Sequence, residues 1–131
     1  MTRFLMYVFF ALLPLWGFSQ QPQQMKKDFV SAFSKGETVP IKSYFKGFVN
    51  MNIPGEKGFY PQNKARWLLQ DFFQKNRVKT FSLKDSGFSG DNFYLIGLYG
   101  STGARWNIYF LFSPGENGFQ IQQIDIEQSE K

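Results

Sequence analysis

The alternation of apolar and polar positions is clearest near the C-terminus, between Asn92 and Glu127. This stretch contains three consecutive runs rich in aromatic and β-branched residues, which are separated by the turn-forming segments STGA and PGENG. Runs of this composition, joined by short turns, are typical of antiparallel strands. The pattern therefore predicts a three-stranded meander that carries much of the hydrophobic core.

Upstream of the meander, segments with helical spacing of apolar residues alternate with strand-like segments. The predicted helices are 24–35, 40–46 and 61–75, the predicted strands are 48–53 and 77–84, and the predicted loops are 54–58 and 86–91. Helices that gather before a meander are typical of an α+β fold. We therefore expect the N-terminal helices to pack on one face of a bent antiparallel sheet of about five strands.

The first hairpin of the meander can be aligned by taking STGA as its loop, which places Tyr99 opposite Trp106. One face of the two strands is then almost wholly apolar, and we expect it to lie under the helices. Gly97 falls on this face in the middle of a strand. A mid-strand glycine marks a bend or a close approach, here expected to be that of a helix.

In the second hairpin, pairing Phe112 with Phe119 in an unbroken ladder would place Asp125 on the apolar face. Burying an unpaired carboxylate is costly. One extra residue at Gln122–Gln123, with both glutamines opposite Tyr109, moves the carboxylate to the other face. We therefore predict a β-bulge at the two glutamines.

The N-terminus has the features of a secretory signal peptide. Arg3 precedes the apolar run FLMYVFFALLPLW, and Gly17 and Ser19 supply small residues for a cleavage site near Ser19/Gln20. Because the run is shorter than the roughly 20 residues that span a bilayer, an uncleaved anchor is the less favoured alternative. The expected organisation is a signal peptide (1–19), a polar tether (20–23), one domain (24–127) and a tail (128–131).

Cleavage would leave no membrane span and would place the protein in the periplasm or outside a bacterium. The sequence has no Cys, which excludes a disulfide and a lipoprotein cysteine, and no His, which excludes the His-based triads. We expect no metal site and no cofactor. The formal charge is +5, but the basic residues are scattered, so a nucleic-acid partner is not expected.

The stretches IKSYFKGFVNMNIPG, YPQNKARWLLQDFF and GFQIQQIDIE resemble a family of small secreted bacterial proteins of unknown function. That family lies within the nuclear transport factor two-like superfamily, which has a cone-shaped, cystatin-like α+β fold. The resemblance covers about residues 24–127. It implies the fold but no single function, because the superfamily includes dehydratases, isomerases, cyclases and non-catalytic binders.

The enzymes of this superfamily often use an Asp–His or an Asp–Tyr pair inside the cone. Without His, the resemblance leaves Asp71 as the candidate general base of an isomerase-like or dehydratase-like enzyme that uses Asp and Tyr. The favoured alternative for Asp71 is an ordinary helix ion pair with Lys75, four residues on. Asp125 and Arg105 are a second conceivable pair, which we interpret as a cross-strand ion pair.

Two further groups of residues are candidates for binding. A ligand pocket, or else plain core packing, is predicted at Phe72, Tyr99, Trp106 and Phe110.

The second face of the meander is too apolar for a fully exposed sheet. Its candidate interface residues are Tyr94, Ile96, Leu98, Asn107, Tyr109 and Leu111. The favoured function is therefore an exported, non-catalytic binding protein that forms a homodimer through this face or binds an apolar small ligand or an envelope protein.

Overall fold

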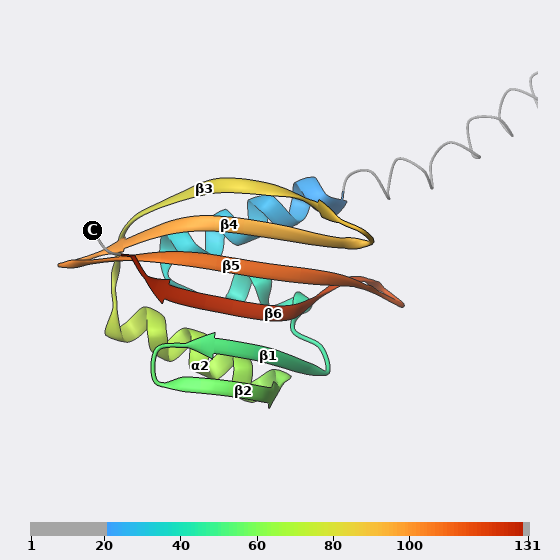
Figure 1. Cartoon of the computed structure of the whole chain (residues 1–131), viewed down its shortest axis with the longest axis horizontal. Coiled ribbons are helices and arrows are strands. Elements are labelled where there is room, and N and C mark those ends of the chain that lie inside the picture. Colours follow the sequence, from blue (N-terminus) through green and yellow to red (C-terminus); the bar gives the residue numbers. More distant parts are fainter. Residues whose placement is uncertain (1–20, 130–131) are drawn as a thin grey trace, which may run out of the picture.

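The computed structural model describes residues 21–129, and all its helices lie on one face of a single curved sheet (Figure 1). The first helix is described over residues 21–35. It is followed by the 3₁₀ helix η1 (Val39–Tyr44), β1 (Phe48–Ile53), β2 (Glu56–Pro61), α2 (Gln62–Lys75), β3 (Val78–Ser89), β4 (Asn92–Ser101), β5 (Ala104–Gly115) and β6 (Gly118–Gln128). The predicted α+β class, with N-terminal helices on a bent sheet, is confirmed.

The sheet has six strands in the order β2-β1-β6-β5-β4-β3, so the expectation of about five is wrong. The missed strand is β2, which occupies part of the predicted loop 54–58. Pro54 and Gly55 form a tight turn there, with Gly55 at φ 86° in the left-handed region that glycine tolerates. β2 then pairs antiparallel with β1, while β1 pairs parallel with β6.

Three other boundaries differ from expectation. The first helix includes residues 21–23, which were expected to form a polar tether. The short helix is a 3₁₀ helix that ends at Tyr44. β3 continues to Ser89, so most of the predicted loop 86–91 is strand and only Gly90 and Asp91 form the turn. The strand extends this far because β4 runs antiparallel beside it and supplies its backbone hydrogen bonds.

The registers of the two C-terminal hairpins can be compared with prediction directly. In the first, Tyr99 lies opposite Trp106, as predicted. In the second, the predicted bulge is present at Gln122–Gln123, but the pairing of Phe112 is wrong: it lies opposite Ile121, two residues from Phe119. The bulged glutamines consequently oppose Leu111 rather than Tyr109. The bulge still returns the isoleucines of β6 to the helix-facing side of the sheet.

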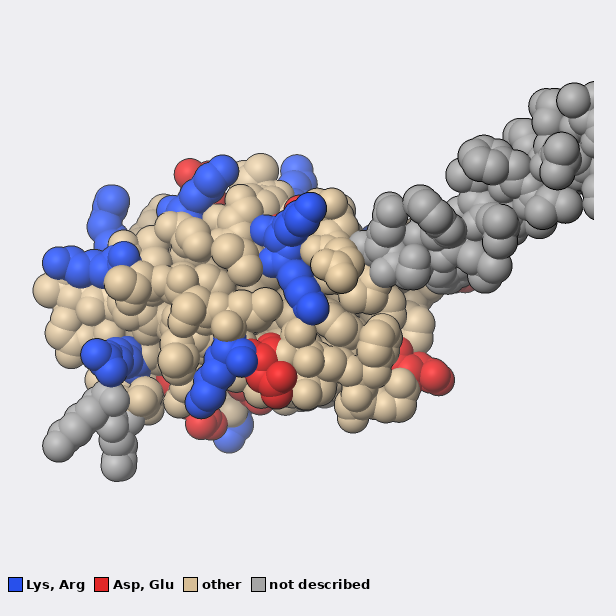
Figure 2. All heavy atoms as spheres, turned by 90° about the horizontal axis from the view of Figure 1, so that it is seen from above, with Lys and Arg blue, Asp and Glu red and all other residues tan. Residues whose placement is uncertain are grey.

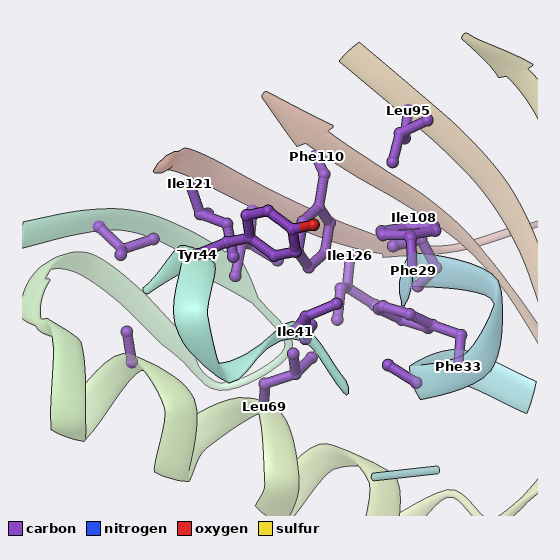
Figure 3. Packing of buried hydrophobic residues seen from close by; sticks show 14 of the residues in the cluster. Phe29, Phe33, Ile41, Tyr44, Leu69, Leu95, Ile108, Phe110, Ile121 and Ile126 are labelled. Carbon is purple, nitrogen blue, oxygen red and sulfur yellow. The ribbon is translucent and has the colours of Figure 1, made fainter. Parts of the chain in front are cut away.

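The core fills the space between this inner face of the sheet and the helices. Figure 3 shows Phe29 and Phe33 of the first helix pointing towards Phe110 and Ile108 of β5. The Phe29 and Phe110 rings meet edge to face with their centroids 4.7 Å apart. Among the described residues, the only buried side chain outside the hydrophobic set is Thr38. The packed core thus contains no carboxylate in the part of the chain that the structure describes.

Gly97 marks a close approach, but a different one from that expected. A Cβ at this position would lie 2.5 Å from the ring of Phe81, which belongs to the neighbouring strand β3 and not to a helix. Phe81 in turn packs against Phe33, with ring centroids 5.2 Å apart. The glycine therefore lets an edge-strand aromatic ring fold over the sheet and join the core.

The predicted signal peptide (1–19) and its cleavage site lie outside the described residues. Within residues 21–129, no helix is both long enough and apolar enough to cross a membrane.

Candidate functional site

The outer face of β4 and β5 carries all six predicted interface residues, and no helix within residues 21–129 covers them (Figure 1). They form three neighbouring cross-strand pairs, Tyr94 with Leu111, Ile96 with Tyr109, and Leu98 with Asn107. We call these six residues the outer patch. Four of these residues are half-buried, whereas Asn107 is exposed and Leu98 is 40% exposed.

Polar groups border the outer patch. The Tyr94 hydroxyl donates a hydrogen bond to Asp85 of β3 at 3.3 Å, and the negative charge of Asp85 is the largest cause of a raised Tyr94 pKa. On the other side, burial first and Asp125 second raise the pKa of Tyr109. Both phenols therefore remain neutral hydrogen-bond donors at physiological pH. An apolar centre with a polar margin is the usual anatomy of a protein interface.

A pocket of about 460 Å³ opens at one end of the molecule, where α2, the β1–β2 turn and the start of β5 meet. We call it the end pocket. It is lined by Ile53, Pro54, Gly55, Glu56, Trp67, Leu68, Asp71, Phe72, Lys75, Asn76 and Trp106. Its volume falls within the range of small-molecule sites.

Two of the four predicted pocket residues line the end pocket. Phe72 and Trp106 meet edge to face there, with ring centroids 5.1 Å apart. The Trp106 indole N–H donates to the Ser101 hydroxyl at 3.3 Å, so its hydrogen-bonding need is met within the protein.

The other two predicted pocket residues, Tyr99 and Phe110, are part of the packed core. The Tyr99 hydroxyl donates to the backbone carbonyl of Asn76 just after α2, and burial raises the pKa of Tyr99 to about 12. Tyr99 therefore anchors the C-terminal end of α2 to the sheet.

Asp71 lies in the wall of the end pocket and forms the predicted ion pair with Lys75, with Oδ2 2.9 Å from Nζ. The Asp71 side chain is 28% exposed and that of Lys75 is 72% exposed, so the carboxylate is the more sheltered partner. Among the described residues this is the only ion pair. The predicted Asp125–Arg105 pair does not form, because β6 places Asp125 opposite Tyr109, and its carboxylate accepts from Gln123 at 2.9 Å.

An Asp–Tyr pair does exist in the structure, at residues that sequence reasoning did not combine. Tyr44 of η1 donates to Asp28 of the first helix at 2.6 Å. Burial first, and then the hydrogen bond to Asp28, raise the pKa of Tyr44 well above its usual value. A phenol that stays protonated between two helical segments serves to hold them together. Neither residue lines the end pocket.

Sequence reasoning also missed Trp67 and the β1–β2 turn as parts of the end pocket. Trp67 is 58% exposed although it is one of the largest side chains in α2. A tryptophan on the polar side of an amphipathic helix was the available signal. The turn carried no comparable signal, because its place beside α2 depends on contacts distant in sequence.

Comparison with known proteins identifies the family to which these features belong. Residues 26–127 match the domain of unknown function DUF4783. No curated protein matches the chain.

Two similar crystal structures are DUF4783 family proteins. The protein from Bacteroides ovatus ATCC 8483 has 24% identity, a TM-score of 0.72, and coverage of 78% of this chain and 93% of that one. The protein from Bacteroides fragilis YCH46 has 26% identity, a TM-score of 0.71, and coverage of 78% and 96%.

The fold extends to more distant proteins. An NTF-2 like protein of unknown function from Silicibacter pomeroyi DSS-3 has 13% identity and a TM-score of 0.57, with 85% of this chain and 98% of that chain covered. At this identity the likeness concerns the fold alone. It places the chain among nuclear transport factor two-like folds, as the sequence stretches predicted.

Proposed function

The chain belongs to the DUF4783 family, a family of unknown function, and from this premise we propose that it is an exported, non-catalytic interaction protein that forms a homodimer through the outer patch. The observation that carries the proposal is the outer patch itself. It is a largely aromatic and aliphatic surface on two interior strands of the sheet, and none of the described helices covers it.

The arrangement of the outer patch suits self-association. A two-fold dimer brings the same patch of both copies together, so each residue can meet a different residue of its counterpart. The aliphatic side chains Ile96, Leu98 and Leu111 offer apolar area, and the two tyrosines combine area with a hydroxyl group. Tyrosine is enriched at interfaces for this reason. Figure 2 shows Lys and Arg side chains dispersed over another face, interleaved with Asp and Glu, without one continuous basic patch.

The non-catalytic part of the proposal is supported by where the acids lie. The alternative function, an isomerase-like or dehydratase-like enzyme, needs a carboxylate and a tyrosine in the cone. Asp71 lies in the end pocket and Tyr99 in the packed core, while the Asp28–Tyr44 pair joins two helical segments. No observation favours the enzyme, so we do not propose it.

Export is proposed from the signal-like residues 1–19. N-terminal sequencing of the protein recovered from the exporting cell tests it. A first residue near Gln20 supports export with cleavage, and retention of Met1 contradicts it.

Light scattering at micromolar concentration tests the homodimer. We expect twice the mass of one chain for the wild type and the mass of one chain for Leu98→Lys, because the substitution brings two like charges into the interface. The matched control is Val39→Lys, which changes an aliphatic residue that is 68% exposed in η1, on the helical side. The control should stay dimeric. A monomeric wild type, or equal effects of the two substitutions, would contradict the proposal.

A further inference from the structure

The end pocket has the features of a ligand site, and it is separate from the outer patch. Its walls come from α2, from the β1–β2 turn and from the inner-face residue Trp106. A homodimer through the outer patch leaves it open. Ligand binding in the end pocket therefore does not depend on the proposed homodimer.

Aromatic rings form much of the wall of the end pocket. Phe72 and Trp106 are almost fully buried, whereas Trp67 is 58% exposed. The exposed indole of Trp67 lies at the rim of the pocket, and the two buried rings lie deeper, so the apolar surface continues from the rim to the floor. Such a surface suits a flat or chain-like apolar body.

The face of the Trp67 indole already attracts a cation. Lys64, one turn earlier in α2, holds its ammonium 4.8 Å from the centroid of the indole. A cation at this distance lies within the range of a cation–π interaction. One face of the indole therefore already takes part in a cation–π interaction. The negative electrostatic potential of an aromatic face attracts a positively charged ligand group and disfavours a negatively charged one.

The ionisable residues that line the end pocket are Glu56, Asp71 and Lys75, which together carry one net negative charge. The whole chain, by contrast, carries +5. Lys75 is mostly in solvent, while the carboxylate it pairs with is sheltered beside the aromatic wall. An exposed ion pair contributes little free energy, so Lys75 can give up its place to a ligand group at small cost.

From these observations we propose that the end pocket binds a small organic cation, in which a protonated amine is attached to an apolar body. The amine would interact with Asp71 and with the aromatic rings, and the apolar body would lie against Phe72 and Trp106. Lys75 would move further into solvent.

A series of probes with one body and different charges tests the proposal. Phenethylamine, 2-phenylethanol and phenylacetate share a phenylethyl or benzyl body and are positive, neutral and negative. The full chain with Trp16→Phe leaves Trp67 and Trp106, both of which line the end pocket, as the only indoles. Binding is followed by tryptophan fluorescence and by the two indole N–H signals in NMR spectra.

We expect phenethylamine to bind more tightly than the alcohol, and phenylacetate to bind least. Asp71→Asn should weaken amine binding by about threefold to tenfold, in line with the loss of one partly exposed charge pair, and should leave the alcohol unchanged. The matched control is Asp91→Asn, the same change in the β3–β4 turn at the opposite end of the sheet (Figure 1), which should alter neither.

Three results would overturn the proposal: no shift of either indole with any probe, phenylacetate binding as tightly as the amine, or equal effects of Asp71→Asn and Asp91→Asn. Trp67→Ala provides a second variant whose folding is not at risk, since the side chain is more than half exposed. It should weaken all three probes and the amine most. Unchanged amine binding by this variant would also contradict the site.

Discussion

The two faces of β4 and β5 belong to the same strands but differ in what covers them. Inner-face residues such as Leu95 and Ile108 are fully buried against helices. Their outer-face neighbours Ile96 and Tyr109 are of similar apolar character, yet no described helix covers them. The inner face shows what hydrophobic patterning does inside one chain. The outer face keeps the same apolar pattern without a covering helix among the described residues, and this is why we propose that it mediates association.

The largest expected effect separates the two faces at neighbouring residues of β5. Phe110→Ala removes a fully buried ring of the inner face and should lower the free energy of unfolding by about 3–5 kcal/mol. Leu111→Ala, on the outer face, should cost about 1 kcal/mol in the monomer, because its side chain is only half-buried. Urea unfolding monitored by circular dichroism measures both.

That comparison requires protein concentrations at which the chain is monomeric, because dimerisation adds concentration-dependent stability. At high concentration the cost of Leu111→Ala should grow, while that of Phe110→Ala should not. Equal costs for the two variants in the monomer would break the distinction between the faces.

A smaller effect tests how closely the Phe81 ring packs against Gly97 on the inner face. Gly97→Ala should destabilise the protein by about 1–3 kcal/mol, as overpacking does, because its new methyl group would meet the Phe81 ring. In a Phe81→Ala background the same substitution should cost much less, since the obstructing ring is gone. A double-mutant cycle of unfolding free energies gives the coupling. Additive effects would show that Phe81 does not lie over Gly97.

The sequence predicted the register of β4 and β5 because two independent signals agree there. The alternation of apolar residues places Tyr99 and Trp106 on one face, and the STGA segment sets the loop. The bulge in β6 was predictable for a similar reason, since an unbroken ladder would have buried Asp125. Where a wrong register carries a clear energetic cost, the sequence reveals the right one.

Other features depend on contacts that no local pattern records. β2 carries Lys57 and Gly58 and looks like a loop, but β1 gives it a partner along one edge. Pro114 looks like the end of a strand, yet it remains in β5 because β4 no longer pairs with β5 at that point. This explains the two-residue error in the second hairpin, whose turn contains only Glu116 and Asn117.

The candidate site was predictable to a similar extent. The six residues of the outer patch follow from the alternation along β4 and β5, and the structure keeps them together. Among the residues that line the end pocket, the sequence had indicated Phe72 and Trp106 as pocket residues and Asp71 as the alternative catalytic candidate. Its shape requires the β1–β2 turn to lie beside α2, an arrangement that follows from the position of β2 at the edge of the sheet.

The most direct test of the account is an isotope-filtered NOE experiment on a mixture of ¹³C-labelled and unlabelled chains, which detects only contacts between two copies. We expect contacts between copies from the Ile96 and Leu98 methyl groups to tyrosine rings of the outer patch. Contacts between copies through the helical side of the molecule, or none at a concentration where the mass is that of a dimer, would contradict it.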